Sequence, residues 1–269
     1  MPQLLPSLIG LPYDASSSYI RGPAQAPPHI RAALHSSHWN TSTEGGYELS
    51  PEKLRDRGDL RLPASAEARL QIENGIAALI ADGSGPLALG GDHSVSYPIL
   101  RAVSRSHPPL TILHLDAHPD LYDEFEGDRF SHACPFARIM EEKLAERLVQ
   151  VGIRTMNDLQ QRQVERYRVQ VIDMRSWVSG NRPQVDGPVY LSVDLDVLDP
   201  AFAPGVSHRE PGGLSVREVL TLVQETGGTL VGADVVEYNP RQDLGGITAT
   251  VAAKIVKEIA GRMLAEGGR

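Results

Sequence analysis

Residues 110–120 read LTILHLDAHPD, an apolar run that ends in three side chains able to bind a metal ion. The apolar part, residues 110–115, is typical of a buried strand, and Asp116, His118 and Asp120 follow at every second position. Side chains spaced in this way point to one side of an extended segment. The stretch therefore predicts a strand that delivers two carboxylates and one imidazole to one edge of a sheet.

Two other segments repeat this arrangement. Residues 87–94, LALGGDHS, place His93 after a short apolar run and a glycine pair, which permits a sharp turn and close packing. Residues 189–196, VYLSVDLD, place Asp194 and Asp196 at the end of a third run. Because ligands in open α/β sheets bind at the carboxyl ends of strands, we expect the three segments to meet there.

Short apolar runs alternate with helical patterns along the whole chain, which predicts one α/β domain over residues 1–269, with a parallel sheet between two layers of helices. The predicted strands are Leu5–Ile9, Leu87–Leu89, Leu110–Leu115, Leu148–Val151, Val169–Ile172, Val189–Val193 and Leu230–Val235. The predicted helices are Pro28–Leu34, Ala66–Ala81, Val95–Ser104, Phe136–Glu146, Asn157–Arg166, Val216–Glu225 and Gly246–Ala265, with Ser94, Asn157 and Ser215 at helix starts. The polar stretch from Ser36 to Pro63 predicts a long excursion with a short helix over Pro51–Arg55.

The composition excludes several classes of protein. A formal net charge of −8 and a pI near 5.6 give no basic footprint for nucleic acid and mildly favour a cationic substrate. A single cysteine, Cys134, rules out an intrachain disulfide framework. No apolar run approaches the roughly 20 residues that span a bilayer. The first residues lack a signal-peptide pattern, so we expect a cytoplasmic location and no membrane partner.

The six candidate ligands suit a pair of divalent ions. Carboxylates and imidazoles bind hard to borderline ions such as Mn²⁺, and four carboxylates would balance the charge of two ions. Two ions about 3.5–4 Å apart can lower the pKa of a shared water. The alternatives are a solvated turn for an isolated DxHxD, or a purely structural metal. Structural sites are usually closed and rich in Cys or His, so the carboxylate-dominated set favours a catalytic centre.

Four segments occur in the order and near the spacing found in the ureohydrolases, the family of arginases and agmatinases: GGDHS (90–94), LDAHPDL (115–121), SVDLDVLDPAFAPG (192–205) and GADVVEYNP (232–240). The chain resembles this family over nearly its whole length. The resemblance implies a three-layer α-β-α sandwich, a trimer or hexamer, and hydrolysis of a guanidino group to urea and an amine by a hydroxide bridging two Mn²⁺ ions, with Ni²⁺ or another ion as the alternative. The implied metal ligands are His93, Asp116, His118, Asp120, Asp194 and Asp196.

The resemblance also implies roles for further residues. His132 matches the family histidine that passes a proton to the leaving amine, and Glu237 matches the carboxylate that binds the guanidinium; with Asp120 they are the candidate catalytic residues. Without the resemblance, His132 is an ordinary loop histidine. A surface role for Glu237 is disfavoured because it directly follows the apolar run 230–236. His114 shares the spacing of Asp116 but lies deeper in the strand, so we expect a hydrogen-bonded neighbour of the ligands. His29, His35, His38 and His107 are expected to be structural.

The substrate is predicted from two segments. Residues 120–136, DLYDEFEGDRFSHACPF, resemble short bacterial agmatinases and lack the asparagine-rich loop of arginases, which implies agmatine as substrate. In residues 204–211, PGVSHREP, His208 stands where the family usually has a threonine, so Ser207 and His208 are candidate substrate-binding residues that alter recognition of the substrate's tail. The N-terminal loop, residues 14–23, follows a strand and is expected either to touch the substrate or to stabilise a turn.

Other functions stay open. Arginine, a guanidino acid, guanidine or formiminoglutamate could replace agmatine within the same family. A deacetylase-like amidohydrolase is the alternative of a different class, and Glu237 with the paired aspartate-rich segments argues against it. A catalytically silent binding protein is the third, and the complete ligand set with His132 argues against that.

Overall fold

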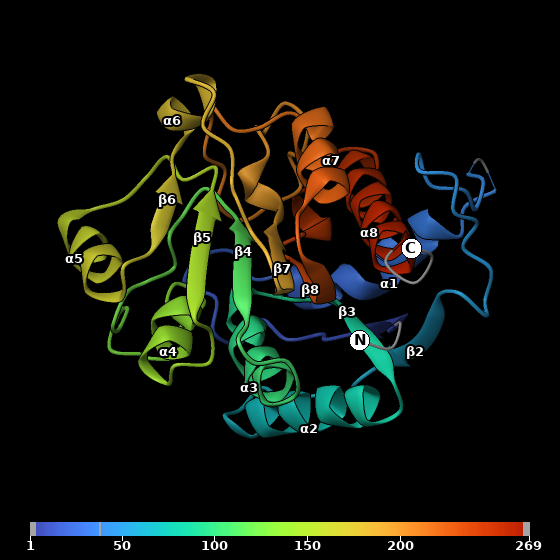
Figure 1. Ribbon diagram of the computed structural model, residues 1–269, viewed down its shortest axis with the longest axis horizontal. Helices are drawn as coiled ribbons and strands as arrows, with labels where there is room; N and C mark the ends of the chain where they lie inside the picture. The colour runs from blue at the N-terminus through green and yellow to red at the C-terminus, as the bar shows by residue number, and fades with distance from the viewer. Residues whose placement is uncertain (1–3, 38, 266–269) are drawn as a thin grey trace.

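One eight-stranded parallel sheet forms the centre of the molecule (Figure 1). The computed structural model describes residues 4–37 and 39–265, so His38 lies outside the described residues. The strand order is β2-β1-β3-β8-β7-β4-β5-β6. The strands are β1 (Leu5–Gly10), β2 (Arg55–Asp59), β3 (Ser84–Leu89), β4 (Thr111–Leu115), β5 (Arg147–Val151), β6 (Gln170–Ile172), β7 (Pro188–Asp194) and β8 (Thr229–Val236).

Helices cover both faces of this sheet. They are α1 (Ala26–Leu34), α2 (Glu67–Ala81), α3 (Ser96–Ser106), α4 (Pro135–Glu141), α5 (Asp158–Tyr167), α6 (Met174–Val178), α7 (Val216–Glu225) and α8 (Ile247–Ala265). Figure 1 shows α1, α7 and α8 grouped together, away from α2, α3 and α4. The three-layer α-β-α prediction is therefore confirmed.

Side chains that alternate between the two faces of the sheet contribute to two apolar cores, one on each face. In β4, Leu113 belongs to the cluster shared with α1, α7 and α8, while its neighbour Ile112 belongs to the cluster shared with α2, α3 and α4. Successive side chains of a strand point to opposite faces, so a continuous apolar run fills two cores at once. Among residues 4–37 and 39–265, no helix is both long and apolar enough to cross a bilayer.

All seven predicted strands are present, but the sequence did not predict β2. The predicted helix over Pro51–Arg55 is wrong: residues 51–53 form a turn and Arg55 begins the strand. The sequence of β2, RDRGD, is exposed throughout and has no strand-like pattern. It is an edge strand, held by backbone pairing with β1. The excursion was predicted correctly; its pairing was not.

Helix ends follow local capping chemistry. Asn157 and Ser215 begin their helices as predicted, and each also forms a capping box, with Gln160 and Glu218 respectively. Ser94 is not the start of the third helical segment. Asp92 caps it instead, its side chain accepting from Ser94 N, and the 3₁₀ turn η2 (His93–Val95) precedes α3. The sequence also did not predict α6, and α4 ends at Glu141, before the predicted end at Glu146.

The ligand segments are turns rather than extended continuations of their strands. β4 ends at Leu115, and an Asp116 carboxylate oxygen accepts a hydrogen bond of 2.6 Å from His118 N. Asp194 caps the 3₁₀ turn η3 (Leu195–Val197) by accepting from Asp196 N at 2.8 Å. In both turns the aspartate side chain accepts a hydrogen bond from the backbone N–H two residues later, and this bond stabilises the turn. The side chains of residues two positions apart therefore still point toward the same site.

Two glycines bring three chain segments against one another. A Cβ added at Gly91 would lie 1.7 Å from Tyr13 O, and one at Gly90 would lie 2.5 Å from a methyl group of Val236. Gly91 O accepts from Glu237 N at 2.9 Å, and Asp92 N donates to Tyr13 O at 2.9 Å. The absent side chains let the N-terminal loop and the end of β8 close around the segment that carries His93.

We predict that Gly91→Ala destabilises the fold, because the new methyl group cannot avoid backbone atoms of Tyr13. The free energy of unfolding should fall by about 1–3 kcal/mol, the range for overpacking. Urea denaturation of this variant beside Gly45→Ala is the measurement. A Cβ at Gly45 would have its nearest neighbour at 3.5 Å, an ordinary contact. Equal unfolding midpoints for the two variants would contradict the prediction.

Candidate metal centre and substrate pocket

The six predicted ligands lie together at the carboxyl ends of three strands near the centre of the sheet. Asp116, His118 and Asp120 follow β4, Asp194 ends β7, and Asp196 lies in η3. His93 begins η2, directly beyond β3 and its glycine pair. In the sheet, β8 lies between β3 and β7, and β4 borders β7. The strands β3 and β4 are consecutive in the chain but are separated in the sheet by β8 and β7. Ligands of open α/β sheets bind at such a change in strand order.

One group of ligand atoms surrounds His93. Its Nδ1 lies 3.1 Å from an oxygen of Asp116, 3.1 Å from one of Asp120 and 3.2 Å from one of Asp194. The same nitrogen is buried and makes no hydrogen bond among the described residues. An imidazole nitrogen aimed at three carboxylate oxygens is a donor set that suits a divalent ion.

A second group surrounds His118. Its Nδ1 lies 3.0 Å from Asp196 Oδ2 and 3.4 Å from Asp116 Oδ1. The other oxygen of Asp116, Oδ2, is the one that faces His93. Asp116 therefore connects the two groups through its two oxygens, as a carboxylate shared by two ions would.

The charges of this cluster require a cationic partner. Burial, together with repulsion from Asp196 and Asp116, raises the pKa of Asp194 well above its usual value. The pKa of Asp196 rises to about 6, chiefly through burial. Burial lowers the pKa of His118, but Asp196 and Asp116 outweigh it and raise that pKa to about 12. These raised pKa values mean that the cluster binds protons in place of a metal ion. A divalent ion would supply comparable positive charge and would be coordinated by several of the carboxylate oxygens at once.

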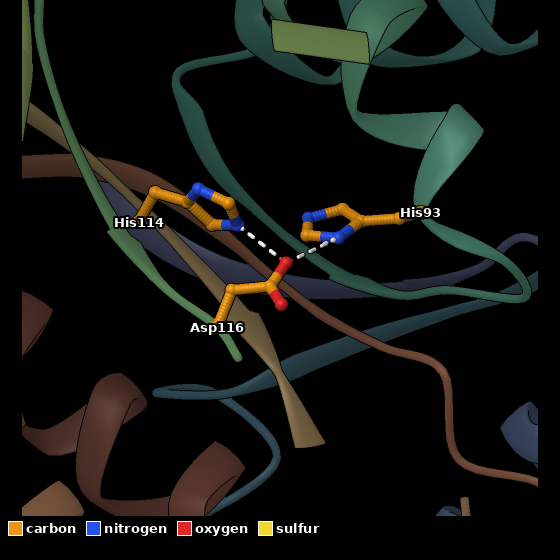
Figure 2. A group of neighbouring side chains, drawn as sticks. All are labelled: His93, His114 and Asp116. Carbon is orange, nitrogen blue, oxygen red and sulfur yellow. Dashed lines mark hydrogen bonds and ion pairs between the residues drawn. The ribbon is translucent and has the colours of Figure 1, made fainter. Parts of the chain in front are cut away.

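His114 supports the cluster and is confirmed as a buried, hydrogen-bonded histidine. Figure 2 shows His93 and His114 on either side of Asp116, both directed at the same carboxylate oxygen. His114 Nε2 lies 2.7 Å from Asp116 Oδ2, and its Nδ1 lies 3.0 Å from Nε2 of Gln150. The three side chains His93, His114 and Asp116 lie close enough to hold an ion. Because the Gln150 amide donates to Nδ1, however, Nε2 carries the hydrogen and donates it to Asp116.

A second chain of hydrogen bonds fixes His93. Its Nε2 lies 3.0 Å from the Ser192 hydroxyl, which donates to Asp234 at 2.7 Å. Asp234 also accepts from the hydroxyls of Tyr190 and Ser96, each at 2.8 Å. All of these groups are fully buried. Such a network sets which His93 nitrogen is free to face the carboxylates.

A cavity of about 160 Å³ opens above the cluster and contains His132, Glu237 and His208 in its lining. His132 Nδ1 lies 2.9 Å from Glu237 Oε1, which also accepts from His93 N at 2.9 Å. Glu237 has a φ of 62° and Asp120 a φ of 50°, a conformation that non-glycine residues rarely adopt. Backbone strain of this kind concentrates at functional sites.

Charge couples His132 to Glu237. Burial lowers the pKa of His132, but the facing carboxylate of Glu237 outweighs it and raises that pKa to about 9. Burial acts on Glu237 in the opposite sense, and His132 holds the pKa of Glu237 below its usual value. The pair is therefore an imidazolium beside a carboxylate at neutral pH.

The two residues of the 204–211 segment occupy different positions. The His208 ring lies 5.1 Å from the His132 ring and 5.4 Å from the Tyr19 ring, between centroids, inside the cavity wall. Burial lowers its pKa, which keeps the ring neutral. The Ser207 hydroxyl donates to Ile20 O at 2.7 Å and accepts from Asn239 Nδ2 at 2.9 Å. Those bonds support a role in ordering the loop; contact between Ser207 and substrate stays a prediction.

Arg154 was not predicted from the sequence. Its guanidinium donates to the carbonyls of Asp196, Val197 and Glu210 at 2.5, 3.2 and 2.5 Å. It thereby joins the turn that carries Asp196 to the loop that carries His208. The sequence held one indication of this role. Arg154 comes shortly after the predicted strand that contains Gln150, and so lies at the same edge of the sheet as the candidate ligands.

Comparisons with known proteins agree with this geometry. A model of the arginase family matches residues 6–261. Arginase 1, mitochondrial, of Arabidopsis thaliana is 47% identical over 276 residues, covering 96% of this chain and 80% of that protein. The structure of arginase from Medicago truncatula has a TM-score of 0.92 at 44% identity, covering 97% of this chain and 88% of that one. A hypothetical agmatinase from Burkholderia thailandensis gives 0.88 at 29% identity, covering 99% and 88%. The chain belongs to the arginase family of ureohydrolases, which are metal-dependent hydrolases of carbon–nitrogen bonds.

Proposed function

We propose that this protein hydrolyses the guanidino group of a small cationic substrate, releasing urea and an amine. The observation that carries the proposal is the bond between His93 N and Glu237 Oε1, which fixes a carboxylate for the guanidinium directly beside the candidate metal cluster. The cavity of about 160 Å³ is small beside the roughly 300–1,000 Å³ of pockets for drug-sized ligands, which supports a compact substrate.

Two divalent ions, proposed to be Mn²⁺, would be held by the six ligands. His93, Asp116, Asp120 and Asp194 would hold one ion, and Asp116, His118 and Asp196 would hold the other, with Asp116 shared. When bound, such a pair acidifies a water molecule for attack on an electrophilic carbon. The oxygen-rich donor set suits Mn²⁺, and metal analysis separates it from Ni²⁺ or another ion.

The protein's own residues orient the substrate and move a proton. Glu237 would accept two parallel hydrogen bonds from the planar guanidinium, which fixes the position of its central carbon. His132, beside Glu237, would give its ring proton to the departing amine, since it is charged at neutral pH and lines the same cavity.

Agmatine is the substrate that the cavity supports best. No lysine or arginine is among the described residues that line it, so the carboxylate of a substrate would meet no guanidinium or ammonium group there. The neutral His208 ring and the aromatic side chains of Tyr122 and Phe125 suit an aliphatic amine tail.

Arginine is the second candidate. Identity to the plant arginases, 47% and 44%, is higher than the 29% to the hypothetical agmatinase, which the 120–136 segment did not lead us to expect. The compartment and the trimer or hexamer also stay proposals, to be tested by fractionation and by light scattering.

The function is tested by urea release from agmatine, arginine, guanidino acids, guanidine and formiminoglutamate, with Mn²⁺ or Ni²⁺ in turn. Urea from agmatine or arginine supports the proposal. Ammonia or formamide in place of urea indicates a formimino substrate. Acetate release from acetylated amines, with no urea from any guanidino compound, would show the deacetylase-like alternative.

We predict that Asp116→Asn loses most bound metal and most activity. The substitution removes the charge of the carboxylate that faces both ligand groups, so both proposed ions lose a ligand. Mass spectrometry of metal content, together with urea release, is the measurement. Glu165→Gln is the control because this carboxylate is exposed on α5, outside the cluster. Normal turnover by a metal-free Asp116→Asn protein would sink the two-metal proposal.

We predict that His132→Asn lowers kcat by about 10²–10⁴-fold, the range for general acid–base catalysis. Metal content should not change, since the described contacts of His132 are to Ser16, Ser18, Glu237 and His208 rather than to the cluster. Steady-state urea release with parallel metal analysis checks both halves. A kcat equal to that of the wild type would remove His132 from the reaction.

We predict that kcat/KM is higher for agmatine than for arginine, and that His208→Thr changes this ratio. A threonine there removes one wall of the cavity and the edge-on contact of the His208 ring with His118, while all six candidate ligands stay in the chain. The ratio is measured for wild type and variant under the same metal loading. An unchanged ratio shows that His208 does not select the tail, and a wild-type ratio in favour of arginine shows the second candidate to be correct.

A further inference from the structure

The exposed Ser18 lies between the buried His132 and solvent. Its hydroxyl oxygen is 2.8 Å from His132 Nε2, and both residues line the cavity. His132 is only 8% exposed. A proton that passes between solvent and this nitrogen therefore meets the Ser18 hydroxyl on its way.

The loop holds Ser18 in place from both sides. On one side, Asp92 accepts from Ser16 N at 3.1 Å and from the Ser17 hydroxyl at 3.2 Å. On the other, Ile20 O accepts from the Ser207 hydroxyl at 2.7 Å. His132 N also donates to Ser16 O at 3.1 Å. The hydroxyl of Ser18 is thus presented to the ring by an anchored segment rather than by a free loop.

The other ring nitrogen of His132 is not available for proton exchange. Nδ1 lies 2.9 Å from Glu237 Oε1, an oxygen that also accepts from His93 N, so Nδ1 is the donor of this bond and keeps its hydrogen. Nε2 is then the nitrogen that loses and regains a proton. Among the described residues, its hydrogen-bond partner is Ser18.

We propose that the Ser18 hydroxyl carries protons between solvent and His132, so that the ring is recharged after each turnover. This inference rests on the proposed function, in which Nε2 gives its proton to the leaving amine. The neutral Nε2 then takes the hydroxyl proton of Ser18, and Ser18 Oγ takes one from a solvent water or a buffer acid at the same time. One proton enters the ring, one leaves the solvent donor, and Ser18 is unchanged.

The test compares Ser18→Thr with Ser18→Val, which have the same shape and differ only in a hydroxyl against a methyl group. We expect Ser18→Thr to keep kcat near that of the wild type and Ser18→Val to lose at least about tenfold in kcat, with KM unchanged. Added imidazole buffer should restore kcat in Ser18→Val, because a small acid can protonate the ring directly. Ser17→Ala, which loosens the same loop, should gain nothing from imidazole.

Equal kcat for the threonine and valine variants would overturn the relay. A loss in Ser18→Val that comes with a raised KM, or that imidazole does not restore, would also overturn it, because that pattern indicates a purely structural loop. These outcomes differ from those of the substrate panel, which concern what is cleaved.

A second measurement needs no turnover. In the metal-free protein, exchange of the His132 ring proton with water is measured by NMR on nitrogen-15-labelled histidine, with His132→Asn giving the assignment. Exchange should be slower in Ser18→Val than in Ser18→Thr, and equal rates would refute the route. If the wild-type protein releases no urea, the proposed function fails while this comparison still decides whether Ser18 is the path to solvent.

Discussion

Four buried carboxylates at one edge of the sheet are the constraint on which the rest of the structure depends. Asp116, Asp120, Asp194 and Asp196 are each less than 10% exposed, and two imidazoles are the cationic groups directly among them. Without added positive charge, such a cluster would cost several kcal/mol for each buried ion. The fold can bury these four carboxylates only if protons or metal ions neutralise their charge. The structural integrity of the site therefore depends on what it binds.

The surrounding residues reduce the freedom of the ligands. Gln150 sets the tautomer of His114, which donates to Asp116, and Asp234 holds Ser192 against His93. Arg154 fixes the carbonyls of the turn that carries Asp196. These partners do not line the cavity, yet they decide which atoms of the candidate ligands face one another. A cluster of like charges would otherwise spread apart, and the hydrogen bonds oppose that.

The glycine pair joins the metal cluster to the substrate cavity. Because Gly91 has no side chain, the Tyr13 carbonyl can approach and accept a hydrogen bond from Asp92 N, and Asp92 in turn anchors the loop that presents Ser18. The same glycine accepts from Glu237 N. The candidate ligand His93, the carboxylate of Glu237 that we propose to bind the guanidinium, and the proposed proton route at Ser18 are therefore positioned by one short backbone segment.

The sequence by itself determined the sheet and the ligand set. Apolar runs must be buried, and carboxylates directly after them must lie at the carboxyl ends of the strands, so seven strands and the convergence of six candidate ligands could be predicted. It could not predict β2, whose polar residues pair with β1 through the backbone and form side-chain ion pairs with Arg31 and Asp82. Nor could it predict the roles of Ser18 and Arg154. Ser18 contacts His132, which is 114 positions away in the sequence, and Arg154 contacts Asp196, which is 42 positions away. Only the packing of the whole chain brings such residues together. The local sequence pattern indicates which residues are buried and which secondary structure they form. The hydrogen-bond partner of a single hydroxyl or guanidinium group, in contrast, is decided by the tertiary structure alone.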